Sequence, residues 1–106
     1  GMTNSVNDKT LRVRLGGIGG TVLGSQLWTT EADGAMDLEI SNSNSVSVQE
    51  AQQFSNRTTD GLVAIAAATA GQNTATTLDL VISGQLETAG ETITLASYTV
   101  DVMKAA

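Results

Sequence analysis

Residues 10–15 read Thr-Leu-Arg-Val-Arg-Leu, and this stretch decides the fold class of the chain. Its apolar side chains alternate strictly with Arg12 and Arg14. Because successive side chains of a strand point to opposite faces, the alternation predicts a β-strand with one buried face and one solvated face. The two arginines argue against a strand that is buried on both faces.

The segments that follow carry a similar signal. Residues 21–30 are apolar and β-branched, and residues 36–41 alternate between apolar and acidic side chains. Between them lies Asp33-Gly34, a pair typical of tight turns in which glycine adopts a positive φ. We therefore expect strand, turn and strand here, joined as a hairpin.

Two interpretations remain open for residues 48–54. Ser47 and Glu50 have the spacing of a capping box, which favours a short helix. Val46 and Val48 favour a strand instead.

The second half of the chain is also expected to be extended. Residues 62–70 are rich in alanine, but their length and flanking turns favour a buried strand over a helix. Residues 76–83 have strand composition, and residues 92–103 form a last extended stretch. The apolar side chains of that stretch shift from odd to even positions, which predicts a bulge or corner near Ala96 and Ser97.

Together these segments predict a single domain over residues 1–106. We expect an all-β or β-dominated α+β fold, a small sandwich or barrel of six to eight short strands with at most one or two short helices. Gly1 before Met2 is typical of a residue left by tag cleavage, and residues 2–9 are expected to form a polar N-terminal arm.

The composition excludes several functional classes. The chain has no histidine and no cysteine, and no set of groups suited to acid-base, nucleophilic or metal chemistry stands out. We therefore predict a protein that is not an enzyme, with no catalytic, cofactor-binding or metal-binding residues. Eleven acids against five bases give a net charge of −6, which disfavours nucleic acid and anionic membranes as direct partners. No apolar stretch approaches the roughly 20 residues that cross a bilayer, and no signal peptide is seen.

Two local patterns suggest ligands but are better explained without them. Gly17 and Gly19 have the spacing of a dinucleotide loop, yet Val22 occupies the third glycine position, so a loop between strands is favoured. Four acids crowd around the predicted hairpin and match no calcium loop, which favours a solvated face; they are Glu31, Asp33, Asp37 and Glu39. A small binding module that holds a glycan or metal ion through this hairpin remains the alternative.

Small side chains and few charges indicate self-association. Only 15% of the residues are charged, against about 25% in a typical domain, which suggests that another subunit covers part of the surface. Residues 62–70 are the favoured contact, because small side chains allow backbones to approach and lose little entropy on burial.

Residues 58–84 resemble the central segment of the lambda-like phage head decoration proteins, which stabilise capsids. The similarity consists of a Thr-Thr-Asp-Gly turn, an alanine-rich strand, a Thr-rich turn into a second strand and a final Ser-Gly; its landmarks are Thr58, Thr59, Asp60, Gly61, Thr74, Thr76, Thr77, Leu78, Ser83 and Gly84. The resemblance implies a small β-rich homo-oligomer, a trimer in that family, that binds coat or other virion proteins. It also implies a location in the virion or in the cytoplasm of a bacterial host.

Overall fold

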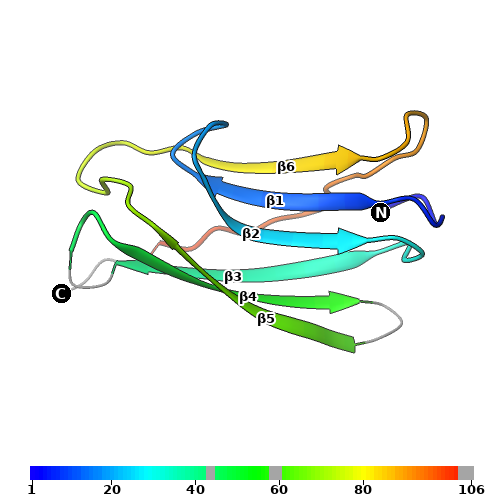
Figure 1. The fold of residues 1–106 in the computed structure, drawn as a ribbon, viewed down its shortest axis with the longest axis horizontal. Coiled ribbons are helices and arrows are strands. Elements are labelled where there is room, and N and C mark those ends of the chain that lie inside the picture. The colour runs from blue at the N-terminus through cyan, green and yellow to red at the C-terminus, as the bar shows by residue number, and fades with distance from the viewer. Residues whose placement is uncertain (43–44, 58–60, 103–106) are drawn as a thin grey trace.

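Six strands form two antiparallel three-stranded sheets in the described part of the chain, as Figure 1 shows. The computed structural model describes residues 1–42, 45–57 and 61–102, without the side chains of residues 54–57 and 61–67. The strands are β1 (Lys9–Leu15), β2 (Thr21–Trp28), β3 (Gly34–Asn42), β4 (Gln49–Arg57), β5 (Gly61–Ala70) and β6 (Leu80–Leu86). One sheet has the order β2-β1-β6 and the other β3-β4-β5, which confirms the predicted all-β fold.

The first sheet has β1 at its centre, so the expected strand is confirmed, but of its apolar side chains only Val13 is buried. Val13 is buried on one face. On the other face, Arg12 donates a hydrogen bond to Gln85 at 2.5 Å and Arg14 donates one to Ser83 at 2.9 Å. The arginines thus bind β6 across the sheet, and their charged groups are not buried.

A β-bulge in β2 turns two consecutive residues inward. Gly24 lies opposite Val13, but the next residue of β1, Arg14, lies opposite Val22, so Leu23 is the extra residue. Both Leu23 and Gly24 are buried. A Cβ at position 24 would lie 3.1 Å from the sulfur of Met36, so the glycine lets β3 approach this face.

The predicted hairpin between β2 and β3 is wrong, because these strands belong to different sheets. Residues 29–33 carry the chain from one sheet to the other. Gly34 does not have a positive φ. A Cβ there would lie 2.5 Å from the ring of Trp28, so glycine is required by the packing of the tryptophan rather than by a turn.

The second sheet decides between the two interpretations of residues 48–54, because they contain the start of β4 and form a strand rather than a helix. Gln49, Ala51 and Gln53 are buried, and the intervening Glu50 and Gln52 are exposed. This period of two is that of a strand. No helix occurs among the described residues.

Residues 61–70 form β5, so the expected strand there is confirmed. The side chains of residues 61–67 lie outside the described set, and the predicted contact role of residues 62–70 stays a prediction. Within the described ranges, no helix has the length and apolar character needed to span a membrane.

Candidate interaction surface

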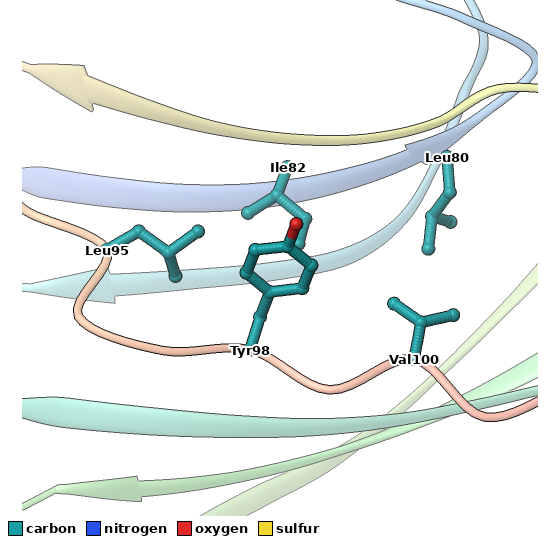
Figure 2. A pocket seen from close by; sticks show the side chains of 5 residues that line it. All are labelled: Leu80, Ile82, Leu95, Tyr98 and Val100. Carbon is teal, nitrogen blue, oxygen red and sulfur yellow. The ribbon is translucent and has the colours of Figure 1, made fainter.

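An apolar pocket lies between β6 and the C-terminal segment, which we define as residues 94–102. Figure 2 shows the five side chains that line it, and its volume is about 330 Å³. Leu80 and Ile82 come from β6, and Leu95, Tyr98 and Val100 come from the C-terminal segment. The pocket is therefore built from two stretches that follow each other in the sequence.

The shift in the apolar pattern of the segment is explained by a bend in the chain. The backbone changes direction between Leu95 and Tyr98 in Figure 2, at the place where a corner is expected. As a result, Leu95 at an odd position and Tyr98 and Val100 at even positions all line one pocket.

The pocket is poorly covered. Leu95 is 51% exposed, Tyr98 is 70% exposed and Val100 is 52% exposed, and Leu80 is also exposed. Single exposed apolar residues are ordinary, but several that adjoin one another mark an interaction site. These residues therefore form a candidate contact surface.

The C-terminal segment has no strand partner within the described residues. Thr94 donates its amide to the carbonyl of Gly1 at 2.8 Å, and residues 95–102 belong to no strand or bridge. The predicted last extended stretch thus pairs only through a bridge between Ile93 and Met2. Among the strands that the structure describes, β6 is bonded only to β1, so no described strand pairs with its outer edge.

The N-terminal arm holds the start of this segment in place. Thr3 donates its amide to the carbonyl of Thr92 at 3.1 Å, and the amide of Thr92 donates to the Thr3 hydroxyl at 2.9 Å. Met2 donates to the carbonyl of Ala32 at 2.7 Å. These bonds dock the arm on the body of the protein.

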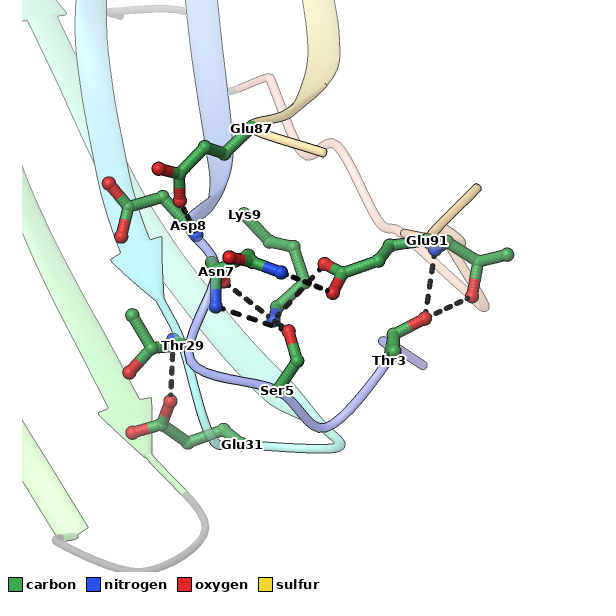
Figure 3. A network of polar contacts seen from close by, with 10 residues as sticks. Thr3, Ser5, Asn7, Asp8, Lys9, Thr29, Glu31, Glu87 and Glu91 are labelled. Atoms are coloured by element: carbon green, nitrogen blue, oxygen red, sulfur yellow. Dashed lines mark hydrogen bonds and ion pairs between the residues drawn. The ribbon is translucent and has the colours of Figure 1, made fainter. Parts of the chain in front are cut away.

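A buried lysine anchors the arm, as Figure 3 shows. Lys9 is 0% exposed, and its Nζ donates to the Ser5 hydroxyl at 3.1 Å and to the Asn7 carbonyl at 2.8 Å. It also lies 3.9 Å from a carboxylate oxygen of Glu91, whose other oxygen accepts a bond from Asn7 at 2.9 Å. Hydrogen bonds from Ser5 and, to a smaller extent, from Asn7 lower the pKa of Glu91. Burial raises this pKa, and the positive charge of Lys9 lowers it. A buried cation is tolerated only with such partners.

A buried glutamine joins the two sheets. The Gln53 side chain on β4 accepts a bond from the amide of Ser25 at 2.6 Å and donates to the Ser25 carbonyl at 2.7 Å. Ser25 lies on β2, an edge strand, so the glutamine takes the place of a neighbouring strand at this point. Sequence reasoning missed this contact because a buried amide breaks the hydropathy pattern on which strand prediction relies.

The glycine-rich loop between β1 and β2 has three of its five amides engaged within the protein. Gly16 and Gly17 both donate to the carbonyl of Asp79, at 3.0 and 3.2 Å, and Gly20 donates to Gly17 at 3.0 Å. A strand rather than a helix follows the loop. The loop therefore lacks the helix start on which a dinucleotide phosphate is bound.

The four acids of the predicted hairpin do not converge. Glu31 is buried and accepts a bond from the amide of Thr29 at 3.0 Å, whereas Asp33, Asp37 and Glu39 are exposed. Among the residues that the structure describes, no three acidic side chains are grouped so that they could hold a metal ion. This geometry gives no support to binding through the acidic residues.

Comparison with models of protein families, with curated proteins and with solved structures finds no match for the chain.

Proposed function

We propose that the protein is a non-enzymatic structural subunit that works by binding further copies of itself. The observation that carries this proposal is the exposed apolar cluster beside β6, where Leu95 is 51% exposed, Tyr98 is 70% exposed and Val100 is 52% exposed. Adjoining apolar side chains that are exposed to this extent mark an interaction site.

The small core supports the same proposal. Among the side chains whose burial is described, few large apolar groups are buried; the buried hydrophobic residues are Val13, Leu23, Trp28 and Ala51. Buried polar side chains accompany them, including Lys9 and Gln53. Apolar burial stabilises by about 25 cal/mol per Å², so a further subunit that covers apolar surface would add stability that this core lacks.

We further propose that the subunit is a phage or prophage virion component, with capsid decoration as the specific role. The support is the resemblance of residues 58–84 to the lambda-like head decoration proteins. In such a role the protein would bind coat or other virion proteins and would act in the virion or in the bacterial cytoplasm. The choice of a trimer rests on this resemblance alone.

Light scattering coupled to size exclusion tests the proposal at micromolar concentration. We expect a mass three times the chain mass of 10.9 kDa. A species at the chain mass would refute self-association. A stable dimer would refute the trimer and leave self-association standing.

A further inference from the structure

We propose that residues 95–102 of one copy add a strand to the free outer edge of β6 in a second copy. This inference rests on the proposed self-association and assigns the surface that carries it. The two elements are different surfaces of the chain, so each copy would donate a segment to one neighbour and receive a segment from another. Such head-to-tail contacts close into rings, which include trimers.

The two elements match in length and chemistry. Residues 95–102 offer eight residues to the seven of β6. Tyr98, Val100 and Val102 alternate with polar side chains, as in a strand with one buried face. Within the described residues, residues 95–102 form no strand or bridge. Their backbone groups can therefore hydrogen-bond to the edge of another sheet, and such bonds give an added strand its affinity.

The edge of β6 has no protection of the usual kind. Edge strands are commonly blocked by charged side chains, but β6 reads Leu-Val-Ile-Ser-Gly-Gln-Leu and carries none. By contrast, the edge strand β2 is bonded by Gln53 at Ser25, and the edge strand β3 carries Asp37 and Glu39. Asp101 is the only charged residue of the C-terminal segment, so pairing at β6 buries little charge.

The chain's own geometry keeps the two elements apart within one copy. A strand that follows β6 directly would normally return along it as a hairpin. Instead, the bridge from Ile93 to Met2 and the bonds between Thr92 and Thr3 direct the chain across the face of the sheet. Leu95, Tyr98 and Val100 then meet the side chains of β6, and its edge stays open (Figure 2). An unpaired segment and an unpaired edge of similar length are the complementary halves of a strand exchange.

Three variants test the surface by light scattering. Tyr98→Asp places a charge in the segment, and Val100→Pro removes a backbone donor without adding charge. Both should reduce the oligomer to the chain mass. Ile18→Asp is the matched control, because Ile18 is 73% exposed on the glycine loop, close to the 70% of Tyr98. This control should keep the oligomer, and circular dichroism should show β-structure in all three variants.

Amide hydrogen exchange on the unaltered protein supplies a readout that does not depend on the variants. Amides of residues 97–102 should exchange slowly in the oligomer and fast after dilution below its dissociation constant. An oligomer that survives Tyr98→Asp and Val100→Pro, or whose segment amides exchange fast, would overturn the β6 assignment and leave the proposed function intact. Fast exchange of the segment amides in the oligomer is also the result expected if the segment binds a different protein. A monomeric unaltered protein would overturn both.

Discussion

Replacing Gln53 should destabilise the protein through the backbone of a strand in the other sheet. Gln53 is 3% exposed and makes two short bonds to Ser25, so Gln53→Ala leaves an amide and a carbonyl of β2 without these partners. Ser25 is exposed, so water reaches these two groups in the variant, and each lost hydrogen bond costs about 0.5 to 1.5 kcal/mol. We expect a net loss of about 1 to 3 kcal/mol, a large share of the 5 to 15 kcal/mol that is typical of domains.

Urea denaturation at one fixed protein concentration measures this loss. With a slope of about 2 kcal/mol per molar, the midpoint should fall by roughly 0.5 to 1.5 M. Gln52→Ala is the matched control, because Gln52 is the exposed neighbour on the same strand, and its effect should stay within about 0.5 kcal/mol. Gln53→Met keeps the length of the side chain without the amide and should lose nearly as much as Gln53→Ala. Equal midpoints for Gln52→Ala and Gln53→Ala, or a Gln53→Met variant as stable as the unaltered protein, would refute the reasoning.

Two further predictions concern the anchored arm and the crossing between sheets. The pKa of Glu91 in the folded protein lies below its ordinary value of 4.5. The ionised carboxylate therefore stabilises the folded state at pH values above 4.5, and this stabilisation is lost as the pH falls through the lowered pKa. Thermal melts from neutral pH to about pH 3 should therefore show a smaller loss for Glu91→Gln than for the unaltered protein, and identical losses would contradict the role of this carboxylate. Gly34→Ala should cost about 1 to 3 kcal/mol and shift the emission of Trp28, the only tryptophan, because the added Cβ meets its ring. Gly19→Ala, where a Cβ meets nothing within 4 Å, should change neither property; a silent Gly34→Ala would show that the ring yields easily.

The strands that sequence reasoning found are those that present the residue types that strands favour. Alternation located β1 and β3, and composition located β2, β5 and part of β6, which runs from Leu80 to Leu86 rather than over the expected residues 76–83. Local spacing also located the bend between Leu95 and Tyr98.

The errors share one physical cause, which is that a partner distant in the sequence decided the outcome. The capping spacing of Ser47 and Glu50 is genuine, but Gln49 and Gln53 are buried through hydrogen bonds to the carbonyl of Gln72 and to Ser25. Hydropathy cannot anticipate such contacts. Likewise, Asp33-Gly34 has the composition of a hairpin, and only the packing of Trp28 reveals why the glycine is there.

The candidate surface was only partly predictable. The apolar character of residues 92–103 is plain in the sequence. The many small side chains and the few charged residues of the chain also indicated self-association. The failure of this stretch to join a sheet was not visible, because it follows from bonds that the first residues of the chain make to Thr92 and Thr94. The pocket beside β6 follows from those bonds as well.

The strand order also sets the order of events during synthesis. β3, β4 and β5 pair with their immediate neighbours in the sequence, so this sheet can form while the rest of the chain is still being made. β1 must wait for β6, since Arg14 and Ser83 are 69 positions apart, and the arm must wait longer for Thr92. Contacts this distant in sequence form slowly. The β3-β4-β5 sheet can therefore form first, and the sheet around β1 is completed only when β6 and the residues that bind the arm have been made.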